Sequence, residues 1–194
     1  MDKNALQIQR SVYTLGAYDG LWVGLAMGFC VMVMVASSRY PSLSLLGLVM
    51  FLAIPFMAWA YLRRAWVSGW VPATFSAVWL HGICIFLFGS IITALMMYIS
   101  LRFVVPGWIE SQTMLAVERL SADPETAEQA RILSEVVKSG QMPSPIYTSV
   151  SSIWLVAFTG SMWSLLFAFI LTHTPRFVKM RATNIEKLIH DGLR

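Results

Sequence analysis

The amino-acid sequence predicts an all-α integral membrane protein with four transmembrane helices in a single membrane domain spanning residues 1–194. Of its residues, 57% are hydrophobic and only 12% are charged, whereas soluble domains usually carry about 25% charged residues. The mean hydropathy is +0.66. Four apolar runs are each long enough to cross a bilayer as a helix, which takes about 20 residues. Short polar links separate the runs, except for one acidic segment between the third and the fourth.

The first span, at about residues 17–37, carries a glycine at every fourth position: Gly16, Gly20, Gly24 and Gly28. In a soluble helix each interior glycine would cost about 1 kcal/mol relative to alanine. In a bilayer, small residues let a second helix approach closely. The row therefore predicts a helix-packing groove.

The second and third spans are expected at about residues 43–62 and 74–102. Pro55 lies inside the second span, where it removes a backbone donor and predicts a kink. The second span ends at Arg63 and Arg64, and tryptophans follow directly. Tryptophan beside arginine is typical of the boundary between membrane and water.

The segment from about residue 106 to 146 is acidic and amphipathic, and it predicts an extracytoplasmic helical hairpin lying on the membrane surface. Asp123 followed by proline is a start signal for the second helix of the hairpin, and Gly140 is its expected stop. Apolar residues recur at helical spacing in both helices, and we expect these stripes to face the bundle or the lipid. The stripes are Ile109, Ala116 and Leu120, then Ala127, Ala130, Leu133 and Val137.

The fourth span, at about residues 149–172, repeats the four-residue spacing of small residues at Gly160, Ser164 and Ala168. A four-residue step turns about 400° on an ideal helix, so both rows slant around their helices. The matching slants predict that the fourth span fills the groove of the first, with self-association through the glycines as the alternative.

Residues 175–194 form a basic, amphipathic tail, which we expect to be a helix lying along an anionic leaflet. Nine of the 14 lysines and arginines lie in this tail, the N-terminal segment and the link after the second span. The predicted hairpin carries six carboxylates. The positive-inside rule therefore favours cytoplasmic positions for both termini.

Two ionisable residues interrupt the apolar runs. An acid such as Asp19 within a membrane segment is by default a functional hypothesis, for example a proton or cation site. We favour a structural role, because Asp19 lies within about a turn of the interface, where water or a helix-terminus dipole can hold it. For His81 we favour a hydrogen bond across the bundle over a ligand role. Asp19 and His81 remain a weak candidate ion or ligand site.

The sequence contains no catalytic motif that we recognise, and it predicts no metal site and no cofactor. Cys30 and Cys84 lie in apolar runs without a second cysteine at metal-binding spacing, and we interpret them as buried small hydrophobic residues. The charge pattern indicates membrane orientation and no nucleic-acid partner.

Four motifs are shared with a known family. They are an early Ala-Tyr-x-Gly-x-x-x-Gly at residues 17–24, the phenylalanine that leads the third span at Phe75, an aromatic-rich exit from that span at residues 98–107, and a Thr-Gly pair at residues 159–160. On these motifs the chain resembles the bacterial inner-membrane proteins of domain-of-unknown-function family 4199. Asp19 stands where the resemblance implies an uncharged residue. Genes of the family often lie near polyprenyl-phosphate glycosyltransferases, which implies a partner role in envelope lipid or glycan metabolism.

These observations predict a non-enzymatic accessory or assembly subunit of the bacterial inner membrane. Its expected partners are membrane lipids and, in a homo- or hetero-oligomer, another membrane protein. The alternative is a small-molecule or lipid transporter, or a lipid-binding membrane protein, that uses Asp19, His81 and the kink at Pro55.

Overall fold

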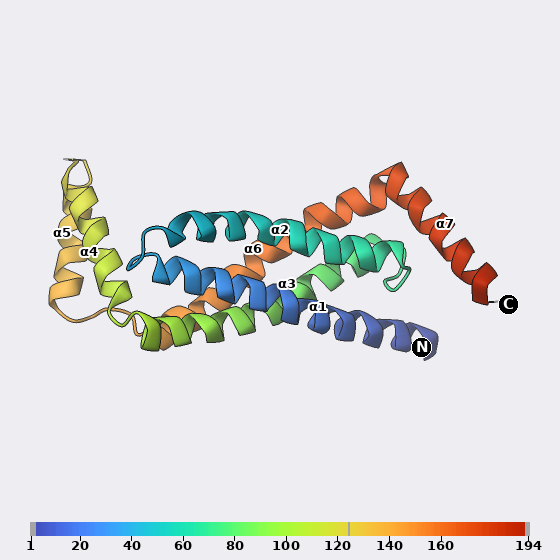
Figure 1. Ribbon diagram of the computed structural model, residues 1–194, viewed down its shortest axis with the longest axis horizontal. Coiled ribbons are helices and arrows are strands. Elements are labelled where there is room, and N and C mark those ends of the chain that lie inside the picture. Colours follow the sequence, from blue (N-terminus) through green and yellow to red (C-terminus); the bar gives the residue numbers. More distant parts are fainter. Residues whose placement is uncertain (1–2, 124, 193–194) are drawn as a thin grey trace.

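The computed structural model describes residues 3–123 and 125–192, which are helical apart from short connections (Figure 1). The described residues form seven α-helices and one π-helical turn, and they contain no strand. In order these are α1 (Lys3–Ala36), α2 (Leu43–Val67), α3 (Phe75–Ile99), η1 (Ser100–Val104), α4 (Trp108–Ser121), α5 (Ala127–Lys138), α6 (Pro145–His173) and α7 (Pro175–Gly192). The predicted all-α fold is confirmed.

Four helices are long and apolar enough to cross a membrane: α1 from Val12 onward, α2, α3 with η1, and α6. The helix α1 begins well before the predicted span, and α6 begins at Pro145 rather than near residue 149. The earlier start of α6 has a local cause. The side chain of Ser144 accepts a hydrogen bond from the backbone N–H of Tyr147 at 3.3 Å, and Pro145 occupies the first turn, where proline loses no hydrogen bond.

The helix α3 lies between α1 and α6 and packs closely against both. Carbon added to Gly20 of α1 would lie 2.7 Å from the carbonyl oxygen of Ile85, and carbon added to Gly24 would lie 2.7 Å from the Cα of Gly89. On the other side of α3, carbon added to Gly82 would lie 2.5 Å from the Cβ of Ser164 in α6. The small residues of α1 and α6 therefore both serve contacts with α3.

This arrangement corrects the predicted pairing of the first and fourth spans. Their slanted rows match, but the backbone atoms that fill the α1 groove belong to α3, which has its own glycines at Gly82 and Gly89. Gly89 meets α1, and Gly82 meets Ser164 of α6. Slant alone could not distinguish between two helices with small residues.

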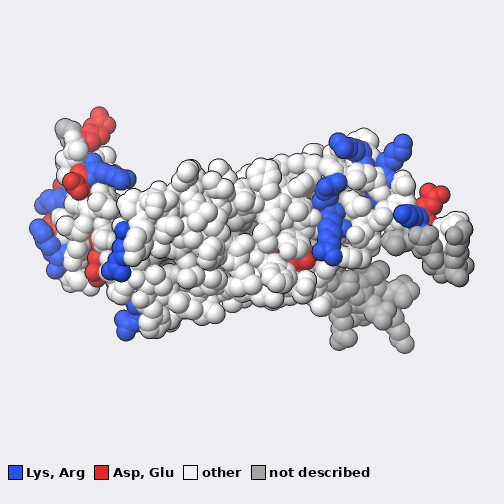
Figure 2. Space-filling model, in the orientation of Figure 1, with Lys and Arg blue, Asp and Glu red and all other residues white. Residues whose placement is uncertain are grey.

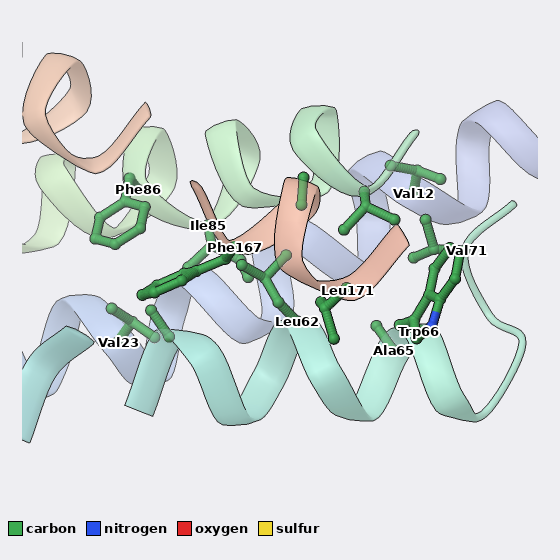
Figure 3. Close-up of a cluster of buried hydrophobic side chains, with 13 residues drawn as sticks. Val12, Val23, Leu62, Ala65, Trp66, Val71, Ile85, Phe86, Phe167 and Leu171 are labelled. Atoms are coloured by element: carbon green, nitrogen blue, oxygen red, sulfur yellow. The ribbon is translucent and has the colours of Figure 1, made fainter. Parts of the chain in front are cut away.

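Buried apolar side chains from all four spanning helices form one cluster (Figure 3). Leu62 of α2, Ile85 of α3 and Leu171 of α6 are fully buried in it. Fully burying a side chain of this size contributes about 1.5–3 kcal/mol in water, and in lipid the gain comes instead from close packing. The helix α2 stays helical through Pro55 and is the most peripheral span, because only 11% of its most apolar stretch is buried.

The helices α4 and α5 stand across one end of the bundle and pack mainly against each other (Figure 1). Their half-buried faces meet, and Ala130 is buried between them. The expectation that these faces turn to the bundle or the lipid is therefore wrong. The predicted start of the second helix is also wrong: Asp123 accepts a hydrogen bond from the N–H of Glu125 at 3.1 Å in a turn, and α5 begins only at Ala127.

The residue after Asp123 lies outside the described residues. The predicted stop at Gly140 is confirmed, since α5 ends at Lys138 and Gly140 has φ of 70°. A left-handed glycine commonly ends a helix in this way.

The start of α1 and the end of α7 lie at the opposite end of the bundle from the hairpin (Figure 1). Lysine and arginine side chains gather at both ends, and the surface between them is almost free of charge (Figure 2). This distribution is what a bundle crossing a bilayer requires, because charge is costly in the hydrocarbon region.

Candidate functional site

Asp19 of α1 and His81 of α3 lie side by side inside the bundle. The Nε2 atom of His81 is 3.2 Å from the Oδ2 atom of Asp19, and their side chains are 0% and 7% exposed respectively. The two residues are far apart in sequence, and the sequence did not predict that they meet. The structure thus joins two separately weak candidates into one buried pair.

Glycine makes the contact possible. Gly16 and Gly20 lie on either side of Asp19 in sequence, and both face α3. Carbon added to Gly16 would lie 2.5 Å from the Cβ of Cys84 and 3.4 Å from the Nδ1 of His81. Without a side chain at Gly16, the imidazole ring fits between the two helices and reaches the carboxylate one turn further along α1.

The two side chains lie within ion-pair distance but make no well-aligned hydrogen bond. Neither ring nitrogen of His81 makes a hydrogen bond of acceptable angle with a described residue, although Nε2 is within ion-pair distance of Asp19. Nε2 can lie within ion-pair distance of Asp19 without a hydrogen bond, because an ion pair has no angular requirement.

Among the residues that the structure describes, no third histidine, cysteine, aspartate or glutamate joins this pair to form a metal-binding group. Cys84 lies one turn along α3 from His81, but it is a buried thiol packed against the backbone of α1. Two ligands do not define a metal site.

A second feature lies further toward the hairpin end: a lateral pocket of about 450 Å³ between α1, α2, α3 and α6. We call it the lateral pocket, and its lining includes Met27, Ile54, Pro55, Phe86, Val156 and Gly160. Phe51 and Trp163, which also line it, are 57% and 46% exposed, so the pocket opens toward the lipid-facing surface.

The hydroxyl and thiol groups of the lateral pocket already make hydrogen bonds within the protein. The hydroxyl of Thr93 donates to the carbonyl oxygen of Gly89 at 2.9 Å, and that of Thr159 donates to the carbonyl oxygen of Leu155 at 2.7 Å. The thiol of Cys30 lies 3.5 Å from the carbonyl oxygen of Gly47. A polar solute would therefore find few free partners there, whereas a hydrocarbon chain would need none.

A family model of proteins of unknown function, DUF4199, matches residues 18–173. The chain belongs to the DUF4199 family. The match covers the buried pair, the lateral pocket and the hairpin, and it ends before α7 of this DUF4199 protein. No curated protein and no solved structure matches the chain.

The remaining residues of the predicted small-residue rows lie in contacts between helices or in the buried core. Gly28 faces Met96 of α3, Gly160 faces the ring of Phe86, and Ser164 and Ala168 are fully buried. One polar residue that the sequence did not single out is Arg181 of α7, which is buried against the end of α2. The sequence feature that could have identified Arg181 is its position on the apolar side of an otherwise basic helix.

Proposed function

We propose that this DUF4199 protein is a non-enzymatic membrane protein that binds the hydrocarbon chain of a membrane lipid in the lateral pocket. The observation that supports the proposal is a pocket lined by all four spanning helices whose hydroxyl and thiol groups are satisfied internally. Its volume of about 450 Å³ falls in the range of about 300–1,000 Å³ typical of ligand pockets. A transporter of polar small molecules is less well supported, because the hydroxyl and thiol groups that line the pocket are already hydrogen-bonded within the protein.

The test is to fill the pocket. Ile54 and Val156 face it from α2 and α6, and both are half-buried. We expect Ile54→Trp combined with Val156→Trp to abolish retention of the lipid that remains on the wild-type protein after extensive detergent exchange. Native mass spectrometry measures the retained lipid directly.

The matched control is Leu48→Trp, because Leu48 is 52% exposed on α2 and does not line the pocket. This control should retain lipid as the wild type does. Equal retention by the pocket variant, or no retained lipid on the folded wild type, would contradict the proposal.

A second candidate function is that of an accessory or assembly subunit, possible partners being enzymes of envelope lipid or glycan metabolism. It is supported by the hairpin of α4 and α5, which stands apart from the bundle and leaves Met114 and Leu115 about half exposed. Purification in mild detergent tests it: a partner protein should co-purify, and Met114→Ser with Leu115→Ser should release it. A monomer free of any other protein would count against this candidate.

We further infer that the protein resides in a bacterial inner membrane with both termini in the cytoplasm. The support is the excess of lysine and arginine at the end where the termini lie. The hairpin would then face away from the cytoplasm.

A further inference from the structure

A basic pocket lies where α7 crosses the end of α2, at the opposite end of the molecule from the hairpin. Its volume is about 460 Å³. Three cationic side chains, those of Arg176, Lys179 and Lys187, line it together with the neutral polar Thr183 and Asn184. Among the described residues its lining contains no carboxylate.

Buried contacts fix α7 in place and hold these cations over the pocket. Arg181 is only 9% exposed, and it donates hydrogen bonds to the carbonyl oxygens of Trp66 at 2.7 Å and Val71 at 2.8 Å. Its guanidinium also lies 4.4 Å from the centre of the Trp66 ring. Asn184 donates to the carbonyl oxygen of Val67 at 3.0 Å. Arg181 thus serves as the anchor of α7, while the other cations stay available to a ligand.

The surroundings of the pocket combine charge with apolar surface. Val67 and Met180 provide its apolar lining. The rest of α2 runs away from the pocket and exposes apolar side chains toward the lipid region. One of them is Phe56, which is 73% exposed. A ligand whose anionic group occupies the pocket could therefore lay its hydrocarbon chains along α2. A soluble anion would make no use of that surface.

We propose that this pocket binds the phosphate headgroup of an anionic membrane lipid. Basic pockets at the cytoplasmic ends of membrane helices are suited to such headgroups, because each lysine or arginine near the surface attracts the negative charge. The guanidinium of Arg176 can bind phosphate oxygens in a bidentate manner, and the two lysines add point charges. The inference does not depend on the lateral pocket, which lies deeper in the bundle and is lined by other residues.

The experiment is a titration of the delipidated full-length protein in mild detergent with phosphatidylglycerol or phosphatidylcholine, followed by native mass spectrometry. We expect preferential binding of phosphatidylglycerol that weakens as the salt concentration rises. In Lys179→Gln combined with Lys187→Gln, that binding should weaken about fivefold for each lysine removed. Lys138→Gln is the matched control, because Lys138 is exposed in the hairpin at the other end, and it should bind as the wild type does.

Three results would overturn the proposal: equal binding of both lipids, an unchanged affinity in the double variant, or complete displacement of the lipid by millimolar inorganic phosphate. The last would identify a site for a free anion. Circular dichroism of each variant shows whether it is folded, and both lysines are exposed, so the fold should be retained. Loss of phosphatidylglycerol binding here with retained lipid in the lateral pocket, or the reverse, separates this inference from the proposed function.

Discussion

At the scale of single residues, the buried pair of Asp19 and His81 is the most unusual feature of the molecule. A lone ionisable side chain in a membrane is costly, by about 2.5–3.5 kcal/mol at the centre of a helix. Two that lie 3.2 Å apart offset part of that cost for each other.

A double-mutant cycle tests the pair. We expect Asp19→Ala to lower the free energy of unfolding by about 1–3 kcal/mol, because His81 is left buried without a charged neighbour. The coupling energy between Asp19→Ala and His81→Ala should be about 0.6–1.7 kcal/mol, the range measured for polar pairs between membrane helices. Unfolding by sodium dodecyl sulfate in mixed micelles gives both values. Purely additive effects would show that the contact carries no energy.

At the scale of helices, glycine decides how closely α1 and α3 approach. The constraint is backbone against backbone at Gly24, where an added carbon would lie 2.7 Å from both the Cα and the carbonyl oxygen of Gly89. Neither atom can rotate away as a side chain can. The row of glycines on α1 is therefore occupied within one chain along α3.

We expect Gly24→Ala to lower the free energy of unfolding by about 1–3 kcal/mol, the usual cost of overpacking, and Gly24→Leu to unfold the monomer. Gly47→Ala in α2 is the matched control. The nearest atom to its added carbon is the Cγ of Met34 at 3.0 Å, which lies on a flexible side chain. Size-exclusion chromatography and detergent unfolding measure the outcomes. If Gly24→Leu only split an oligomer into folded monomers, packing of these glycines within one chain would be refuted.

The docking of α7 against the end of α2 depends on one residue, Arg181. Burial lowers the pKa of Arg181, but a guanidinium stays protonated at any physiological pH, so its two hydrogen bonds to carbonyl oxygens persist. The cation also lies at the C-terminal end of α2, where the helix dipole favours positive charge.

We expect Arg181→Gln to release α7 from the end of α2, because hydrogen bonds to charged groups contribute about 1.5–3 kcal/mol each. Arg181→Lys should rescue docking only in part, since one ammonium cannot reach both carbonyls and stack on Trp66. Hydrogen exchange of the α7 backbone amides measures docking. The exposed Arg39→Gln at the far end should leave the exchange unchanged, and equally slow exchange in Arg181→Gln would contradict the anchoring role.

At the scale of the whole molecule, the uncharged middle and the two charged ends define a membrane orientation (Figure 2). The hairpin and the link between α1 and α2 lie at one end, and the start of α1, the link between α2 and α3, and α7 lie at the other (Figure 1). Both ends of the described chain therefore lie at the same end of the bundle, which we propose to be the cytoplasmic side.

Labelling with a membrane-impermeant maleimide tests which side that is. Cys30 and Cys84 are buried, so the background should be low. In intact spheroplasts we expect Ser139→Cys in the hairpin to react, and His190→Cys in α7 to react only after the membrane is permeabilised. Both positions are exposed in the structure. The opposite pattern would invert the proposed topology.

The sequence by itself determined the number of spans, the all-α class, the hairpin and the basic last helix. Hydropathy over about 20 residues and helix stop signals such as Gly140 are local properties, so they can be read from consecutive residues. It also identified the glycines of α1 as contact positions, because only their spacing was needed.

Only the tertiary structure decided which helices meet. In the folded chain α3, and not α6, fills the α1 groove, and Asp19 lies beside His81. Arg181 anchors α7 to the end of α2, and a basic pocket lies between these two helices. The physical reason is that several helices carry small residues, so spacing alone leaves their pairing open. Pairing depends on how all four backbones pack together, so no single segment of the sequence determines it.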